Sequence, residues 1–244
     1  MEKEIICKYN GEKIYGIINV PDYFEGKIPI VILCHGFSDN YNSMRDFCDL
    51  LEEKSIASYL FDFRGGGFDC HSDMEMKDMS ILTEIDDLNT VIDMVKTLDF
   101  IDTDRVYLLG HSQGGLVTAL VANNRVEDIE SIFLLSPAFN IPDCAEKVPL
   151  PEEGEVLNLV CGQASRKYFE DARSINLFED VTSFNKPVYI FHGDLDDFVP
   201  LSYSEKACDA YDNAELNVLE DEGHTFNFRS ENFIVKRVNE VINK

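Results

Sequence analysis

The pentapeptide Gly-His-Ser-Gln-Gly at residues 110–114, centred on Ser112, constrains the fold of this chain more than any other segment. It follows the apolar stretch 105–109 and precedes 115–122, whose small and apolar residues are typical of a helix. A G-x-S-x-G sequence occurs by chance in many proteins, but between a strand and a helix it predicts a sharp turn that exposes the serine. The two glycines let the strand and the helix approach each other closely at this turn.

Short apolar segments alternate with helical patterns along most of the chain. The expected strands are 4–8 and 13–20, joined by a hairpin at Asn10-Gly11, then Ile28–Cys34, 57–63, 105–110, 131–136, 187–192 and 215–219. The expected helices are 43–54, 80–98, 112–123 and 231–243. Such alternation predicts an α/β fold with a mostly parallel central sheet, helices on both faces, and ligand-binding residues at the carboxyl ends of the strands.

The length of 244 residues and the apolar content of 45% predict one domain that spans 1–244. The segment 137–175 breaks the alternation, carries four prolines and is long for a connection. Its apolar residues favour a small packed cap, inserted within the domain, over a flexible linker.

Composition excludes several classes of function. The formal charge of −25 argues against nucleic acids and anionic membranes, because both are bound mainly through clustered Lys and Arg. The sequence lacks a signal-peptide core and a run of about 18 apolar residues, which predicts a cytoplasmic protein outside the membrane. The seven cysteines show no C-x-x-C pair or metal-ligand spacing, so we expect free thiols and no metal site.

A serine hydroxyl needs a base to take its proton and a carboxylate to orient that base. Of the five histidines, His224 is the best candidate for the base, because it lies in a polar loop between the last strand and the last helix. The acid is expected in the loop 192–200, which offers Asp194, Asp196 and Asp197.

This order of serine, acid and histidine resembles that of the α/β-hydrolase superfamily. The acid loop of that superfamily commonly reads G-x-x-D-x-x-V-P, which places the acid at Asp196, with Asp197 as the alternative. The resemblance also implies an oxyanion hole formed by the backbone N–H groups of Phe37 and Gln113. It implies no metal and no organic cofactor.

Three further segments make the resemblance more specific. His-Gly-Phe at 35–37, Gly-His-Ser-Gln-Gly-Gly at 110–115 and Leu-Ser-Pro-Ala at 135–138 together resemble the bacterial cinnamoyl (feruloyl) esterases. In that family a cap covers the acyl pocket, which implies that Asp143 and Tyr168 contact the ring hydroxyls of a hydroxycinnamate. A solvated charge and a packing aromatic are the structural alternatives for these two residues. His35, beside the oxyanion loop, has either a structural or a substrate-orienting role.

The function expected from this resemblance is hydrolysis of a small-molecule ester, a hydroxycinnamate ester, through an acyl-enzyme on Ser112. A short-chain carboxylesterase or a monoacylglycerol lipase would use the same catalytic residues with a different acyl pocket. A non-catalytic receptor with a hydrolase fold is the alternative from another class of protein, and a complete serine, histidine and aspartate set argues against it. The oligomeric state stays open, with a homodimer as one alternative.

Overall fold

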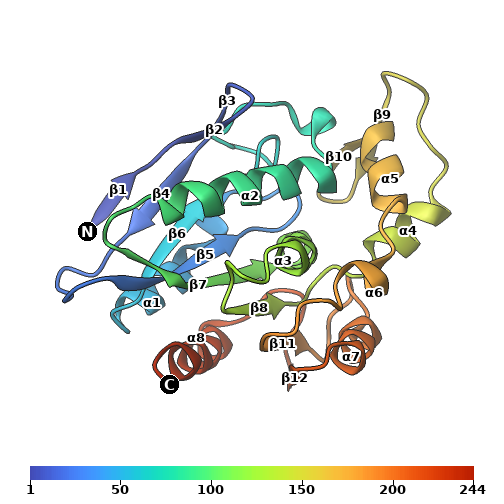
Figure 1. The fold of residues 1–244 in the computed structure, drawn as a ribbon. Coiled ribbons are helices and arrows are strands. Elements are labelled where there is room, and N and C mark those ends of the chain that lie inside the picture. The colour runs from blue at the N-terminus through green and yellow to red at the C-terminus, as the bar shows by residue number, and fades with distance from the viewer.

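The computed structural model describes residues 1–244 and has one eight-stranded sheet and two separate pairs of strands (Figure 1). The large sheet consists of β1 (Glu2–Glu4), β4 (Gly16–Asn19), β5 (Ile28–Cys34), β6 (Ala57–Phe61), β7 (Ile101–His111), β8 (Ser131–Leu135), β11 (Val188–Gly193) and β12 (Ala214–Leu219). The pairs are β2 (Cys7–Tyr9) with β3 (Glu12–Ile14), and β9 (Val156–Leu159) with β10 (Gly162–Ser165). The helices are α1 (Arg45–Glu52), α2 (Ile81–Lys96), α3 (Gln113–Asn124), α4 (Ile141–Lys147), α5 (Arg166–Arg173), α6 (Leu177–Asp180), α7 (Leu201–Ala210) and α8 (Phe228–Ile242), with short 3-10 turns η1 (Tyr41–Met44) and η2 (Met76–Asp78).

The strand order in the large sheet is β1-β4-β6-β5-β7-β8-β11-β12. All neighbours from β6 to β12 run parallel, and the two antiparallel pairings are β1 with β4 and β4 with β6. The predicted mostly parallel sheet is therefore confirmed. Asn10 and Gly11 have φ of 50° and 89° and join β2 to β3, which suits a tight Asn-Gly hairpin turn. The single strand predicted over 13–20 is instead divided between β3, which pairs with β2, and β4, which enters the large sheet.

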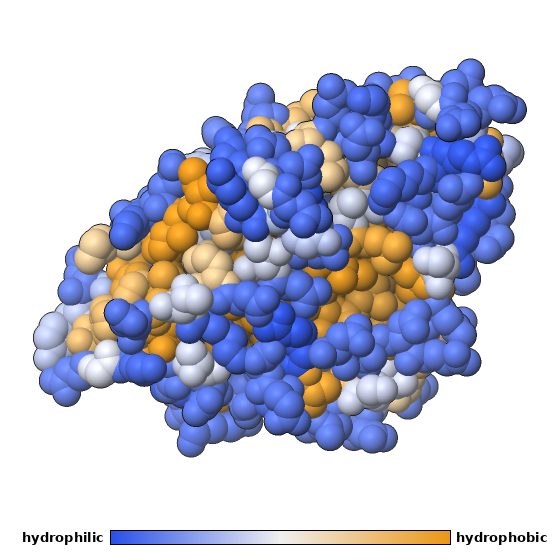
Figure 2. All heavy atoms as spheres, turned by 45° about the horizontal axis from the view of Figure 1, so that its top comes forward, coloured by the Kyte–Doolittle hydropathy of each residue, from blue (hydrophilic) through white to orange (hydrophobic).

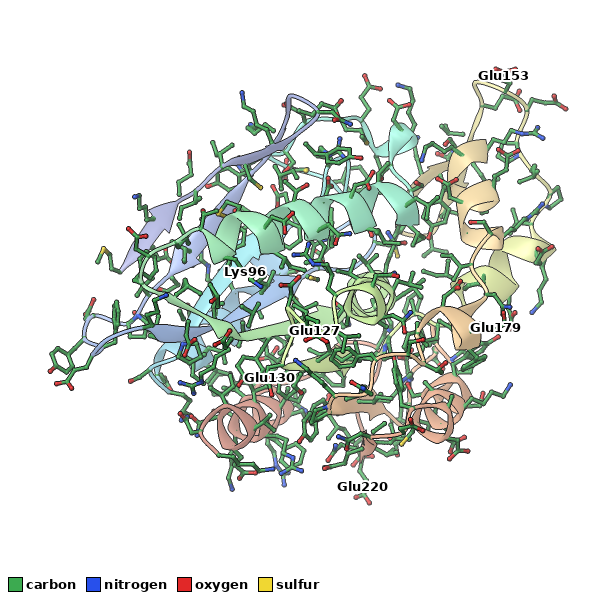
Figure 3. The ribbon with its side chains drawn as sticks, viewed as in Figure 1. Lys96, Glu127, Glu130, Glu153, Glu179 and Glu220 are labelled. Atoms are coloured by element: carbon green, nitrogen blue, oxygen red, sulfur yellow. The ribbon has the colours of Figure 1, made fainter.

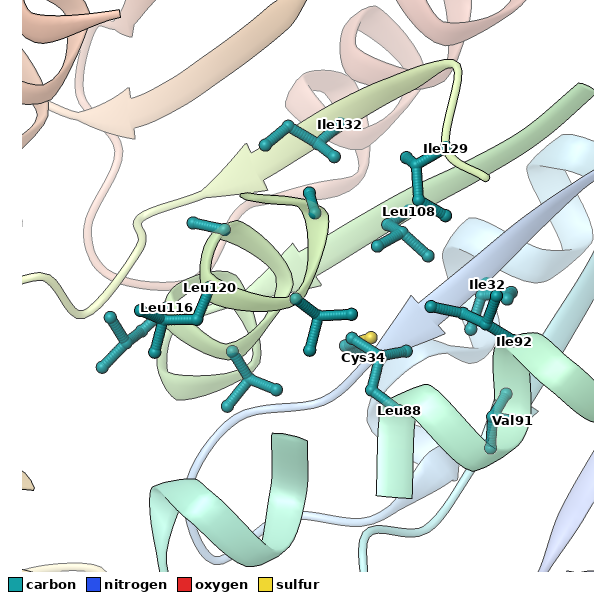
Figure 4. Packing of buried hydrophobic residues seen from close by; sticks show 14 of the residues in the cluster. Ile32, Cys34, Leu88, Val91, Ile92, Leu108, Leu116, Leu120, Ile129 and Ile132 are labelled. Carbon is teal, nitrogen blue, oxygen red and sulfur yellow. The ribbon is translucent and has the colours of Figure 1, made fainter. Parts of the chain in front are cut away.

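Helices cover both faces of the sheet, as predicted. Within β5, Ile30, Ile32 and Cys34 belong to the larger core cluster, whereas Val31 and Leu33 belong to the cluster on the opposite face. This period of two is the geometry of a strand that is buried on both sides, so nearly every residue of β5 is apolar. The larger cluster lies under α2 and α3, as Figure 4 shows, and the other lies against α1 and α8.

The segment 137–175, called the insertion below, folds into α4, β9, β10 and α5 between β8 and β11. Tyr168 and Phe169 of α5 belong to the larger core cluster, so the insertion is packed on the sheet domain. The Nζ atom of Lys167 also donates to Ser80 Oγ at 2.5 Å, at the start of α2. The interpretation of 137–175 as one cap unit stays a prediction, since α4 and α5 pack partly on the main body.

Hydrophilic side chains cover most of the face drawn in Figure 2, and apolar side chains gather there in separate patches. The structure contains no helix with the length and apolar character that a membrane crossing demands.

The turn between β7 and α3 is packed tightly against β5. A Cβ atom on Gly114 would lie 2.3 Å from the carbonyl oxygen of His35 and 2.5 Å from that of Cys34. A Cβ atom on Gly110 would lie 2.4 Å from the carbonyl oxygen of Gly114. Backbone atoms are the obstacles in each case, so a side chain at either position forces the strand and the helix apart.

We therefore expect Gly114→Ala to lower the free energy of unfolding by about 1–3 kcal/mol, the usual cost of overpacking. Gly223→Ala is the matched control, because its Cβ would meet nothing within 4 Å. The control should change stability by less than about 1 kcal/mol. Urea unfolding of both variants checks this, and equal stability of the two would contradict the close approach described.

Candidate active site

Ser112 lies at the turn between β7 and α3 with φ 55° and ψ −120°, a conformation that is strained for a residue with a side chain. Four backbone hydrogen bonds hold it there. Its N–H donates to Leu135 O at 2.9 Å, and its carbonyl oxygen accepts from the N–H groups of Gly115 at 3.0 Å, Leu116 at 3.3 Å and Ala138 at 2.8 Å. The end of β8 and the start of α3 thus fix the direction of the Ser112 side chain.

His224 lies in the loop between β12 and α8, and its side chain reaches Ser112 from across the sheet. The distance from His224 Nε2 to Ser112 Oγ is 2.8 Å, and that from His224 Nδ1 to Asp196 Oδ2 is also 2.8 Å. His111 Nε2 donates to the carbonyl oxygen of His224 at 2.8 Å, so the residue beside the serine also holds the histidine backbone. Burial lowers the pKa of His111 to about 4, which keeps this ring neutral.

Asp196 follows β11, and its carboxylate is enclosed by donors. The Oδ1 atom accepts from the amides of Phe198 and Val199, both at 2.9 Å. Burial alone would raise the pKa of Asp196, but the hydrogen bonds from His192, His224 and the Val199 amide outweigh it and hold this pKa well below its ordinary value. Asp196 is therefore ionised at neutral pH.

The structure brings Asp196, rather than the alternative Asp197, together with His224. Asp194 and Asp197 are exposed, and neither side chain makes a hydrogen bond. His192 is a further neighbour of the acid. It is buried, as expected for a hydrogen-bonded core histidine, and its Nε2 lies 2.9 Å from Val199 O and 3.3 Å from Asp196 Oδ2.

The backbone N–H groups of Phe37 and Gln113 are the donors that the resemblance implied for an oxyanion hole. Phe37 follows the carboxyl end of β5, and its amide makes no hydrogen bond within the protein. Gln113 is the first residue of α3, where an N–H group has no partner inside the helix. Both residues line the same pocket as Ser112. Two free amide donors beside a serine are suited to stabilise a developing oxyanion.

The pocket around Ser112 and His224 has a volume of about 600 Å³. Seven of its lining residues are apolar, namely Phe37, Ala138, Ile141, Cys161, Tyr168, Phe198 and Val199. The insertion supplies four of these seven, Ala138, Ile141, Cys161 and Tyr168, so it forms one wall of the pocket. No group of three or more His, Cys, Asp or Glu side chains with metal-binding geometry occurs in the structure.

Two of the residues expected to contact substrate do not reach this pocket. His35 is buried, with Nδ1 2.8 Å from Gly36 O and Nε2 accepting from Phe63 N at 3.1 Å, so both ring nitrogens serve the backbone. Its substrate-orienting role is therefore wrong, and its structural role holds. Asp143 is exposed and accepts a hydrogen bond from the Tyr203 hydroxyl at 2.5 Å, outside the pocket. The expected contact between Asp143 and a substrate ring is likewise wrong for this structure.

Tyr168 does line the pocket, but its hydroxyl is already bound. It donates to Gln113 Oε1 at 2.6 Å, and its ring lies 5.6 Å from that of Phe37. Tyr168 therefore contacts the side chains of both residues whose amides face Ser112. Sequence reasoning had not indicated this link, because it joins the insertion to the first residue of α3.

A buried carboxyl group, Glu84 of α2, lies near the Gln113 side chain and was not anticipated. It is 0% exposed, and neither of its oxygens has a hydrogen-bond partner. Burial raises the pKa of Glu84 well above its ordinary value; the Gln113 side chain lowers it by less, and Asp87 one turn away raises it further. Glu84 is thus held as a neutral acid beneath the pocket. A glutamate on the apolar face of the helix predicted over 80–98 was the signal that could have revealed it.

Residues 27–164, more than half of the chain, match the family model described as serine aminopeptidase, S33. The chain belongs to this family. Among curated relatives, the S33-family chain is 34% identical over 112 residues to an uncharacterized 31.7 kDa protein of the traX-finO intergenic region in Escherichia coli, covering 44% of this chain and 38% of that protein. It is 32% identical over 111 residues to a putative esterase/lipase 2 of Mycoplasma genitalium, covering 44% of this chain and 37% of that one. The chain thus spans less than two fifths of the length of these two relatives.

A solved structure gives a likeness along nearly the whole chain. Est1E from Butyrivibrio proteoclasticus, with ferulic acid bound, superimposes with a TM-score of 0.89 at 26% sequence identity, covering 98% of this chain and 100% of that one. This S33-family chain therefore has the α/β-hydrolase fold, as the resemblance implied.

The buried position of Glu84 predicts a pH-dependent stability that Glu84→Gln removes. Above about pH 4.3 the unfolded chain loses this proton, whereas the folded chain keeps it because its pKa is raised, so the free energy of unfolding falls as the pH rises. Glutamine is neutral in both states. We expect the stability of Glu84→Gln relative to the unsubstituted protein to increase as the pH rises from about 5 to about 8.

Urea unfolding at several pH values measures this difference. Glu153→Gln, at an exposed position of the insertion labelled in Figure 3, is the matched control and should show no such increase. A difference between Glu84→Gln and the unsubstituted protein that does not change with pH would show that Glu84 is ionised in the folded state.

Proposed function

We propose that this chain is a serine esterase that hydrolyses hydroxycinnamate esters, such as feruloyl esters, through an acyl-enzyme. The observation that carries the proposal is the continuous line of hydrogen bonds from Ser112 through His224 to Asp196, at the base of a largely apolar pocket. The likeness to Est1E, whose structure holds ferulic acid, supports the choice of acyl group.

In the first half of the reaction, Ser112 Oγ attacks the ester carbonyl carbon while His224 Nε2 accepts the hydroxyl proton. The carbonyl oxygen becomes negative and is stabilised by the amides of Phe37 and Gln113. When the tetrahedral intermediate collapses, the bond to the alcohol oxygen breaks, and His224 returns the proton to the departing alcohol. Asp196 keeps the Nδ1–H of His224 directed toward itself, which leaves Nε2 free to act as the base.

In the second half, a water molecule takes the place of the alcohol. His224 Nε2 accepts a proton from the water as its oxygen attacks the acyl carbon, and the same two amides stabilise the oxyanion. Collapse breaks the bond to Ser112 Oγ, to which His224 returns the proton. The products are the free carboxylic acid and the unmodified serine.

The pocket walls support an aromatic acyl group. Phe37 and Tyr168 present their rings to the space above Ser112, and Phe198 lies 5.3 Å from the His224 ring. Because the hydroxyl of Tyr168 is bound to Gln113, we assign this residue ring-to-ring contact with the substrate. The polar lining groups that remain for ring hydroxyls come from Ser38, Asn140 and Thr225.

A short-chain carboxylesterase or a monoacylglycerol lipase is the second candidate function. The same hydrogen-bonded residues serve it equally well, and the apolar pocket also suits an aliphatic chain. The putative esterase/lipase among the relatives agrees with this second candidate. The acyl preference of the purified protein distinguishes the two.

Removal of any member of the proposed triad should abolish turnover without unfolding the protein. We expect Ser112→Ala and His224→Ala each to lower kcat for an ester by at least about 10⁴-fold, and Asp196→Asn by about 10⁴-fold, because the imidazole then loses its orienting charge. Asp197→Asn is the matched control for the acid and should keep its activity. Initial rates and labelling by a fluorophosphonate probe check this; labelling of Ser112→Ala, or a greater loss in Asp197→Asn than in Asp196→Asn, contradicts the assignment.

The acyl preference predicted from the pocket is measured as the ratio of kcat/KM for methyl ferulate to that for methyl butyrate. We expect a ratio well above one, because the aromatic acyl group buries more apolar surface against Phe37, Tyr168 and Phe198. A ratio well below one would preserve the serine chemistry and assign the protein to the carboxylesterases or acylglycerol lipases.

A further inference from the structure

The pocket beside Ser112 contains one charged side chain, that of Asp39, and no Lys or Arg among its lining residues. The proposed mechanism uses Ser112 and His224 of this lining and gives Asp39 no task. The other titratable rings near the nucleophile are His111, which is neutral, and His224, which is the base.

The backbone holds Asp39 in a fixed position close to the nucleophile. Ser38 adopts the left-handed conformation, with φ 60°, and forms a β-bridge to Gly67. The Asp39 N–H donates to Gly36 O at 3.3 Å, and Asp39 Oδ1 accepts from Asn40 N at 3.1 Å. A Cβ atom on Gly36 would lie 3.2 Å from Ser112 Cβ, so this loop passes directly beside the reacting serine.

No cation in the protein compensates this carboxylate. Asp39 takes part in none of the ion pairs of the structure, although it is half-buried. The charge of Asp39 acts on His35 and His111, and burial keeps the pKa of both rings lowered. The charge of Asp39 therefore lies in the pocket lining with no ion pair to cancel it.

Ester hydrolysis changes the charge of the molecule that occupies this pocket. A neutral ester and water give an alcohol and a carboxylic acid, and near neutral pH the acid loses its proton to water and becomes a carboxylate. That carboxylate forms at the carbon bonded to Ser112 Oγ, beside the loop that carries Asp39. Like charges at short range repel each other, and more strongly where protein replaces water.

We propose that Asp39 selects against anionic ligands in the pocket, so that neutral esters are preferred and the carboxylate product is expelled. This inference rests on the proposed esterase function. The overall charge of −25 acts in the same direction but from a distance. The glutamates labelled in Figure 3 come from several segments of the chain outside the pocket lining, and salt screens such charges beyond about 8 Å. Asp39 is distinguished from them by its place in the pocket.

The test compares inhibition by ferulate with inhibition by its neutral primary amide, using methyl ferulate as substrate. In each variant the quantity measured is the ratio of the inhibition constant of ferulate to that of the amide. Asp39→Asn keeps the oxygen that accepts from Asn40 and removes only the charge. We expect the ratio to fall about two- to fivefold in this variant, the size of effect that one partly exposed charge pair produces.

The control is Asp104→Asn, an exposed position near the amino end of the sheet, at which the ratio should stay that of the unsubstituted protein. The effect of Asp39→Asn should also become smaller at about 1 M salt, where the Debye length is about 3 Å, whereas a merely structural loss would persist unchanged. An unchanged ratio, or an equal fall in Asp104→Asn, would overturn the proposal.

Measurements of ester turnover distinguish a failure of this proposal from a failure of the proposed function. If methyl butyrate is hydrolysed and methyl ferulate is not, butyrate and butyramide replace the aromatic pair, and the same change in ratio is expected. Absence of any ester turnover would overturn both proposals. Turnover that depends on Ser112, together with an unchanged ratio, would overturn the role of Asp39 alone.

Discussion

The strained turn at Ser112 is the constraint on which the rest of this structure depends. It places a residue with φ 55° at the point where β7 meets α3. This strained conformation persists because contacts with the surrounding backbone hold it in place. Backbone hydrogen bonds with Leu135 and Ala138 hold Ser112 at the end of β8. Gly114, which has no Cβ, packs against the end of β5. The same turn begins α3 at Gln113, which lines the pocket with Ser112. One local distortion thus sets the positions of the proposed nucleophile and of one proposed oxyanion donor together.

The sequence was most informative where backbone pattern alone decides the structure. Ile28–Cys34 is apolar throughout because β5 is buried on both faces, and its bounds agree with the prediction. Asp196 and His224 follow strand ends, and all parallel strands end at one edge of the sheet, so they were predicted to meet. The failures concern the direction of side chains. Asp143 turns outward to Tyr203 and His35 inward to the backbone, and no spacing rule distinguishes these directions before the helix or loop is packed.

The unexpected polar groups of the core follow from how α2 is packed. Glu84 and Asp87 occupy the same buried face one turn apart, but their surroundings differ. Arg64 Nε donates to Asp87 Oδ1 at 2.5 Å, so Asp87 has a cation, whereas Glu84 has only the Gln113 carboxamide beside it. Two buried carboxylates at this spacing would repel each other. Because Arg64 pairs with Asp87 alone, burial and the charge of Asp87 both favour the protonated form of Glu84. Glu84 thus lies near the glutamine that accepts a hydrogen bond from Tyr168 and begins α3.

The electrostatic design of the site is therefore asymmetric. Asp196 is surrounded by donors and stays charged, and in the proposed mechanism it orients the His224 ring through the contact with Nδ1. Asp39 has no cation beside it and lies in the lining of the pocket that contains Ser112. A cation in that space would stabilise both the oxyanion and the carboxylate product, so it would also slow the departure of product. Neutral amides stabilise the oxyanion at short range without attracting the carboxylate from solution, and a fixed carboxylate at the rim then makes the charged product the weaker ligand.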